Sequence, residues 1–264
     1  MDSPAVAEEM PSVGIDAPTP MPQPLAPAWL AASLVAIAAA AVLFCCLVAV
    51  LSTLGLFASF GTDGATDFLQ QLKFDRQLRT QVGAATVSAA YVGLALATLA
   101  AAWLRGGRGW RDLVALRPMR SGRTAWRDTL GIAALTLGYI AVTTYAAEHA
   151  RDRSLLVTGP TDMVLISLLV GNLVVLAPIA EELVFRGWIY TALRRSFSFW
   201  PSYLVTIALF AGIHWDASHI RIVQVLPLSA ALGLMRERAG SIKPTIALHA
   251  TYNLVIVAIR LAFT

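Results

Sequence analysis

Seven apolar stretches, separated by short polar or basic segments, run along the chain from about residue 28 to its end. A stretch of about 20 apolar residues is long enough to cross a bilayer as a helix. The first stretch, residues 28–60, would extend about 50 Å as a straight helix, against a hydrocarbon core of about 30 Å. We therefore expect it to tilt, to bend near Gly55 or to project beyond the bilayer.

Each of the other six stretches predicts one further membrane helix. The linker between the first two, residues 61–81, is polar and of mixed charge, so we expect an interfacial helix or a loop. The remaining expected helices cover residues 82–104, 127–147, 163–193, 201–215, 222–235 and 244–264. The sequence therefore predicts an all-α fold, a polytopic transmembrane bundle of about seven helices.

The composition agrees with a membrane protein. Hydrophobic residues make up 57% of the chain and charged residues 14%, whereas soluble domains carry about 25% charged residues. Residues 1–27 are rich in proline and contain no Lys or Arg, so we expect a disordered tail and no signal peptide. Membrane helices with an arginine-rich loop then occupy residues 28–161, and a second set of helices occupies residues 162–264.

Arginines between the apolar stretches give the chain a formal net charge of +4. Cytoplasmic loops of membrane proteins carry such an excess, so we place residues 105–127, 194–195 and 236–243 in the cytoplasm. The basic residues of the linker, residues 61–81, then lie on the opposite side of the membrane, which is an exception to the positive-inside rule. Nucleic-acid binding would need a soluble domain with interleaved basic and aromatic residues, and the sequence contains no such pattern. The alanine- and arginine-rich composition suggests a bacterial inner membrane.

Three ionisable residues stand together inside the fourth apolar stretch: Glu181, Glu182 and Arg186. Charged groups at such depth are costly and mark functional sites. On a helix, Glu182 and Arg186 are at positions i and i+4 and can pair, whereas Glu181 points about 100° away from Glu182. We interpret Glu182 and Arg186 as a structural pair and Glu181 as the reactive group.

Polar residues also stand inside the late stretches, namely His214, His249 and Asn253. His249 and Asn253 are at positions i and i+4, so they share a helix face, and Phe210 has the same spacing to His214. Glu181 and His214 each lie about 20 Å of helix from the shared end of a helical hairpin. We therefore expect their side chains to meet.

Pro178 stands three residues before Glu181. A proline inside a helix removes one backbone hydrogen bond and pushes away the carbonyl of residue i−4, here Val174. A kink near Gly171 and Asn172 would open a polar cavity, or it would serve packing alone. The sequence leaves these two interpretations open.

Peptide hydrolysis needs an activated water, stabilisation of the tetrahedral oxyanion and protonation of the leaving amine. Glu181 fits the base, with His214 positioning the water or sharing its proton, while His249 and Asn253 fit the oxyanion donors. Alternatively, Glu181, His214 and His249 hold a zinc ion whose bound water is the nucleophile. The residues leave both arrangements open, and the zincin signature His-Glu-x-x-His is absent.

Three motifs follow one another on the late helices: Glu181-Glu182-x-x-x-Arg186, Phe210-x-x-x-His214 and His249-x-x-x-Asn253. In this order they resemble the motifs of the CPBP family, the CAAX-protease and bacteriocin-processing membrane proteins, also called ABI proteins. Each motif alone is weak, but the three in register are specific. The resemblance covers the chain from about residue 163 to its end, and the earlier helices match nothing specific.

The resemblance implies an intramembrane endopeptidase related to the type II CAAX prenyl endopeptidases. It implies that Glu181 is the catalytic base, that Arg186 is a structural partner, and that His214, His249 and Asn253 complete the site. Family members are described both as metalloproteases and as glutamate-dependent proteases, so the metal stays open. The expected partners are a membrane-associated peptide or protein substrate and the lipid bilayer. Prenylated substrates belong to eukaryotes and are not extended to this chain.

Two other functional classes would also keep polar residues at mid-depth in a membrane. A proton-coupled transporter or channel holds carboxylates and histidines there, although this sequence has no evident inverted repeat. A non-catalytic bacteriocin-immunity or scaffold protein would keep the same motifs for folding alone. Cleavage of a membrane peptide separates the protease from both.

Overall fold

The structure, a computed structural model, describes residues 26–149, 163–215 and 220–262. Almost all of the predicted tail, residues 1–27, and of the polar connection, residues 148–162, lies outside the described residues. Within the described ranges the chain is mostly helical and forms no strand, so the predicted all-α fold is confirmed.

The helical segments fall where the apolar stretches predict them. In chain order they are α1 (Pro27–Phe74), α2 (Arg76–Gly106), η1 (Gly107–Gly109), α3 (Trp110–Leu113), α4 (Arg123–His149), α5 (Met163–Gly171), η3 (Asn172–Leu176), α6 (Ala177–Glu182), η4 (Leu183–Ile189), α7 (Tyr190–Ser196), α8 (Phe199–Ile213), α9 (Ile220–Ala239) and α10 (Lys243–Ala262). The segments from α5 to α7 form one continuous rod.

Five helical segments of the described chain are long and apolar enough to cross a membrane: Pro27–Phe74, Arg76–Leu113, Arg123–Ala146, Met163–Ser196 and Lys243–Ala262. The apolar helix α8 is shorter, and α9 is not one of the five. The described ranges therefore contain seven helical rods, as predicted. By length and apolarity, five of these rods are able to cross a membrane completely.

The first helix bends at a different glycine from the one predicted. Gly61 has a φ of 68° and a ψ of −174°, whereas Gly55 stays within the regular helix. A left-handed φ is open to glycine without steric cost, so the bend falls where the backbone adopts it. The expected bend near Gly55 is therefore wrong.

The linker predicted as an interfacial helix or a loop is helical on both sides of Asp75. The Asp75 carboxylate accepts hydrogen bonds from the backbone N–H groups of Gln77 and Leu78, at 2.8 and 3.1 Å. It therefore caps the N-terminus of α2 and closes the α1–α2 hairpin.

The arginine-rich loop before α4 is tied to the connection between α9 and α10. The Arg120 backbone N–H donates to the Ala239 carbonyl at 2.8 Å, and the Ile242 N–H donates to the Ala115 carbonyl at 3.1 Å. Two of the basic segments therefore lie side by side at one end of the bundle.

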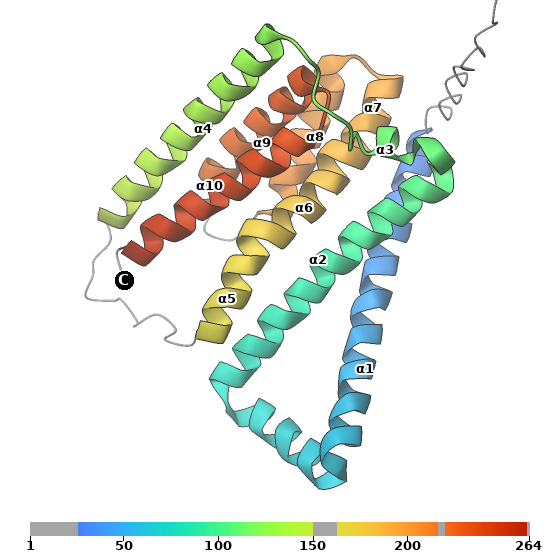
Figure 1. Ribbon diagram of the computed structural model, residues 1–264, viewed down its shortest axis with the longest axis vertical. Helices are drawn as coiled ribbons and strands as arrows, with labels where there is room; N and C mark the ends of the chain where they lie inside the picture. The colour runs from blue at the N-terminus through green and yellow to red at the C-terminus, as the bar shows by residue number, and fades with distance from the viewer. Residues whose placement is uncertain (1–25, 150–162, 216–219, 263–264) are drawn as a thin grey trace, which may run out of the picture.

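The rod from α5 to α7 is the centre of the molecule. In Figure 1 it runs between the α1–α2 hairpin on one side and α4, α9 and α10 on the other. The α2 helix packs along α5, η3 and α6, and α10 packs against η3 and α6 from the other side. Side chains from several helices can therefore meet on α6.

Two turns of this central rod are π-helical, η3 and η4, and they flank α6. Pro178 lies in α6 and has no N–H to donate to the Val174 carbonyl, so the backbone before it widens. The predicted irregularity near Asn172 is present and takes the form of a π-helical turn. In such a turn some backbone carbonyl groups lose their hydrogen-bond partner within the helix, so they can accept hydrogen bonds from groups outside the rod.

Candidate active site

The Glu182–Arg186 pair lies at the centre of the bundle. Arg186 Nη1 donates to Glu182 Oε1 at 3.0 Å, and both side chains have no exposed surface. Arg186 Nη2 also donates to the Ser229 carbonyl at 3.1 Å and to the Ser229 hydroxyl at 2.9 Å. A buried ion pair needs such additional hydrogen bonds to offset its desolvation. The predicted pairing is present, and it joins α6 to α9.

A second arginine supports the π-helical turn that carries Arg186. Arg236 Nε donates to the Arg186 carbonyl at 3.1 Å, and its Nη2 donates to the Thr191 hydroxyl at 3.1 Å. Arg236 is buried. The sequence counted it among the loop arginines, but it fills a structural position inside the bundle.

The Glu181 carboxylate lies where three other helices approach α6. The Nε2 atom of His214, at the end of α8, and the Nε2 atom of His249, on α10, each lie 3.9 Å from Glu181 Oε2. The hydroxyl of Tyr91, on α2, lies 3.5 Å from Glu181 Oε1. The structure therefore brings Glu181, His214 and His249 together and adds a tyrosine that the sequence did not single out.

The two oxygens of Glu181 differ in their surroundings. Oε1 has the Tyr91 hydroxyl within reach, whereas Oε2 is buried and has no hydrogen-bond partner among the residues that the structure describes. Buried carboxylate oxygens are normally hydrogen-bonded. Oε2 therefore faces two imidazoles at a separation above 3.5 Å, at which polar groups are commonly bridged by a water rather than bonded directly.

The Nδ1 atom of each imidazole makes a hydrogen bond that holds the ring in place. His214 Nδ1 lies 2.8 Å from the Phe210 carbonyl, and His249 Nδ1 lies 3.1 Å from Glu182 Oε1. Each partner is an acceptor, which assigns the hydrogen of each neutral ring to Nδ1 and leaves a lone pair on Nε2. Two nitrogen lone pairs and a carboxylate oxygen then face one another.

Phe210 packs the site together. Its ring centroid lies 4.7 Å from that of His214 and 5.9 Å from that of His249. The Arg186 guanidinium carbon lies 4.3 Å from the centre of the same ring, within cation–π range. The phenylalanine spaced four residues before His214 is therefore a support that links the buried ion pair to both imidazoles.

Asn253 is placed differently from the other motif residues. Its amide nitrogen donates to the Leu173 carbonyl at 2.7 Å, in the π-helical turn η3. No contact with Glu181 or with the two imidazoles is present for Asn253 among the described contacts. An amide group has a second N–H, so its predicted oxyanion role stays a prediction.

Asn172 and Ser88 form a polar contact one turn away that the sequence did not predict. Asn172 Nδ2 donates to the Ala84 carbonyl at 2.9 Å, and the Ser88 hydroxyl donates to Asn172 Oδ1 at 2.8 Å. Ser88 and Tyr91 are three residues apart on α2 and share a helix face. This spacing of polar side chains in an apolar helix was the signal that could have identified them.

The predicted zinc ligands supply suitable donor types, two imidazole nitrogens and a carboxylate oxygen. Each Nε2 lies 3.9 Å from Glu181 Oε2, which is wider than the about 3.3 Å between neighbouring donors around tetrahedral zinc. Within the described ranges no group of three or more His, Cys, Asp or Glu side chains is placed to hold a metal ion. The zinc ligation therefore stays a prediction, as does the alternative of a bridging water.

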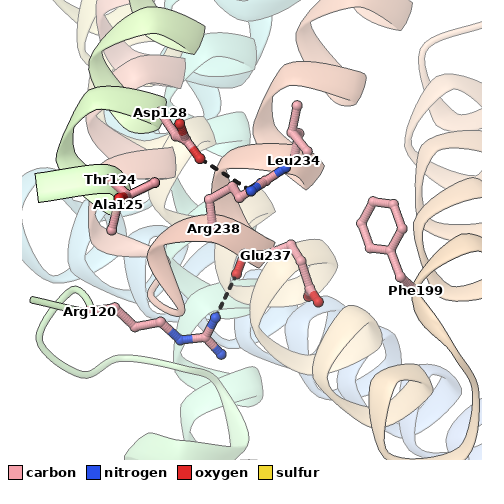
Figure 2. A pocket seen from close by; sticks show the side chains of 8 residues that line it. All are labelled: Arg120, Thr124, Ala125, Asp128, Phe199, Leu234, Glu237 and Arg238. Carbon is pink, nitrogen blue, oxygen red and sulfur yellow. Dashed lines mark hydrogen bonds and ion pairs between the residues drawn. The ribbon is translucent and has the colours of Figure 1, made fainter. Parts of the chain in front are cut away.

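A cavity of about 470 Å³ lies away from this cluster, between the first turn of α4, the last turns of α9 and the start of α8. Figure 2 shows its lining, with the Asp128–Arg238 ion pair and the hydrogen bond from Arg120 to the Glu237 carbonyl. No motif residue lines it. Its position beside the arginine-rich loop separates it from the chemistry around Glu181.

The sequence profile of a family described as type II CAAX prenyl endopeptidase Rce1-like matches residues 163–255. The match begins with α5 and ends within α10, so it contains all three motifs. Residues 163–255 are therefore similar to this Rce1-like family. The predicted resemblance to the CPBP proteins is thereby confirmed, and the helices α1, α2 and α4 lie outside the Rce1-like match.

One curated relative is also similar to part of the chain. The UPF0177 protein YbdI of Lactococcus lactis subsp. lactis (strain IL1403) is 35% identical over 85 residues. These residues are 32% of this chain and 44% of that protein, so the match spans less than half of the relative. No solved structure matches the chain.

Proposed function

We propose that this protein is an intramembrane endopeptidase that hydrolyses a peptide bond in or next to the bilayer. The observation that carries the proposal is Glu181 Oε2, a buried and unsatisfied carboxylate oxygen that two imidazole nitrogens face at 3.9 Å. The match of residues 163–255 to a family described as endopeptidases supports it. The substrate class is a membrane-associated peptide or protein.

In the proposed mechanism a water molecule lies between Glu181 Oε2 and the two Nε2 atoms. Glu181 takes a proton from the water, and the water oxygen attacks the carbonyl carbon of the scissile peptide bond. A tetrahedral oxyanion forms and is stabilised by hydrogen-bond donors around it. Glu181 then gives its proton to the leaving nitrogen, the C–N bond breaks, and a carboxylic acid and an amine are released.

The remaining groups orient these steps. In this proposal His214 accepts the second hydrogen of the water at Nε2, and His249, when protonated at Nε2, donates to the oxyanion. Glu182 fixes the ring of His249 through Nδ1, and Arg186 balances the charge of Glu182. The free N–H of Asn253 is a further oxyanion donor in this proposal.

The experiment compares wild type with Glu181→Gln in cleavage of a membrane peptide library by the full-length protein in lipid vesicles. We expect Glu181→Gln to lower kcat by about 10²- to 10⁴-fold, because the amide cannot take the proton of the water. The matched control is Glu237→Gln, since this carboxylate pairs with Arg194 outside the cluster and its loss should leave cleavage intact. Equal cleavage by wild type and Glu181→Gln would contradict the mechanism.

The zinc arrangement remains the alternative form of the same proposal, with Glu181, His214 and His249 as ligands. Bound zinc would lower the pKa of its water and supply the nucleophile. Metal analysis of the purified protein, together with cleavage in the presence of a chelator, distinguishes the two forms. Metal at one equivalent and loss of cleavage on chelation would favour zinc. Proton flux across the vesicles without cleavage would instead favour a transporter.

A further inference from the structure

We infer that Tyr91 is a positioning residue of the site, which fixes the Glu181 carboxylate so that Oε2 is the oxygen that meets the water. The inference rests on the proposed function. Tyr91 lies on α2 and therefore outside residues 163–255, the part of the chain that matches the Rce1-like family. A helix outside the matched segment thus supplies a group to the reacting carboxylate.

The two oxygens of the Glu181 carboxylate face different groups. The Tyr91 hydroxyl lies 3.5 Å from Oε1, and both imidazole Nε2 atoms lie 3.9 Å from Oε2. The terminal torsion of a glutamate side chain is broad and roughly two-fold, so an untethered carboxylate samples many orientations. A hydroxyl that donates to one oxygen restricts this rotation and keeps the other oxygen directed toward the imidazoles.

The position of Tyr91 along α6 is fixed by a second contact. Asn172 bonds to the Ala84 carbonyl and to the Ser88 hydroxyl, one turn of α2 before Tyr91. Between membrane helices such polar bonds set the register, because apolar side chains gain little by leaving lipid for a neighbouring helix. The Ser88–Asn172 contact therefore holds the tyrosine at the depth of Glu181.

Other tyrosines of the bundle have different partners. The Tyr190 hydroxyl donates to Glu237 Oε2 at 2.8 Å, and the Tyr203 hydroxyl donates to the Ala230 carbonyl at 3.0 Å. Neither of these bonds involves Glu181 or the two imidazoles. Tyr190 is therefore a matched control, because Tyr190→Phe also removes one hydroxyl bonded to a glutamate carboxylate.

The test compares Tyr91→Phe, Tyr190→Phe, Glu181→Gln and wild type, all as full-length protein in lipid vesicles with one cleaved membrane peptide. We expect Tyr91→Phe to lower kcat by about 10- to 100-fold with an unchanged KM, since misplaced reacting groups cost about this much. We also expect the acid limb of its pH–rate profile to move to higher pH, because the ionised carboxylate loses a hydrogen-bond donor. Tyr190→Phe should keep the wild-type kcat and profile.

A spectroscopic measurement separates this inference from the proposed function. The Glu181 carboxylate stretch, obtained by infrared difference between wild type and Glu181→Gln, should shift in Tyr91→Phe and not in Tyr190→Phe. Wild-type kcat, pH profile and carboxylate stretch in Tyr91→Phe, with Glu181→Gln inactive, would overturn the role of Tyr91 and leave the proposed function standing. Undiminished cleavage by Glu181→Gln would overturn the proposed function, and the positioning role with it.

Discussion

The first helix and the central rod are both strongly apolar, yet they use their side chains in opposite ways. In α1 large side chains such as Val35 and Leu43 are 69% and 68% exposed, and the buried residues are Ile37, Ala41 and Ala65. In the rod every residue of η4 is buried, Arg186 included. The comparison teaches that in this protein an apolar side chain is not buried merely because it is apolar, since α1 exposes such side chains while the rod buries them around a charged pair.

The physical reason is the solvent. In water an exposed leucine loses the free energy of burial, but in lipid it is already in apolar surroundings. A charged group in lipid is costly wherever it stands, so it is found inside the bundle with partners. Glu182 and Arg186 are bonded to each other at 3.0 Å, although Glu182 Oε2 and Arg186 Nε have no hydrogen-bond partner among the described residues. No arginine or lysine pairs with Glu181 in the described part of the chain, where its charged neighbours are His214 and His249. This difference is why we propose Glu181 as the reactive residue.

The largest expected effect comes from removing one member of the buried pair. Arg186→Met keeps much of the side-chain volume but leaves the Glu182 charge buried and unpaired, so we expect the free energy of unfolding to fall by about 3–5 kcal/mol. His249 also loses the fixed orientation of its acceptor Glu182. Unfolding in detergent mixtures, with cleavage measured in parallel, tests this. The control is Arg194→Met, whose ion pair with Glu237 is about one third exposed and is worth about 1 kcal/mol or less.

The sequence alone identified the ionisable residues of the central rod. Glu181, Glu182 and Arg186 stood out because ionisable residues are rare in apolar stretches, and i, i+4 spacing was enough to pair the last two. His214 was placed near Glu181 from helix lengths alone. The i, i+3 spacing of Ser88 and Tyr91 on α2 was a signal that these residues share a face, but their partners were not predictable until the packing of α2 against α6 was known.

The details of the backbone were also beyond the sequence. The bend of α1 falls at Gly61 and not near Gly55, and because glycine tolerates a positive φ at either position, the sequence alone could not decide between them. Pro178 predicted an irregularity, but the sequence did not predict two π-helical turns or the capture of the Leu173 carbonyl by Asn253. Arg236 was taken for a loop residue because its partners, Arg186 and Thr191, lie on a separate rod.

Removing the polar contact between Ser88 on α2 and Asn172 in η3 should lower the free energy of unfolding by a smaller amount. Ser88→Ala removes the hydroxyl that donates to Asn172 Oδ1, and we expect the free energy of unfolding to fall by about 1 kcal/mol. If this contact sets the depth of Tyr91, kcat should fall by a small factor in the same direction as for Tyr91→Phe. The control is Ser33→Ala, whose hydroxyl accepts from Trp188 at another level of the bundle. A loss of kcat equal in both variants would argue against a register role for Ser88.

The smallest effect is expected on the exposed face of α1. Leu43→Ala removes a side chain that is 68% exposed, and if this face meets lipid the free energy of unfolding should change by no more than about 0.5 kcal/mol. Ile37→Ala is the matched variant on the same helix, because Ile37 is only 3% exposed and its removal leaves a cavity worth about 2 kcal/mol. Both are measured by unfolding in the same detergent mixture. A cost for Leu43→Ala as large as for Ile37→Ala would mean that this face packs against protein, and the contrast between α1 and the central rod would then reflect a missing neighbour and not the lipid.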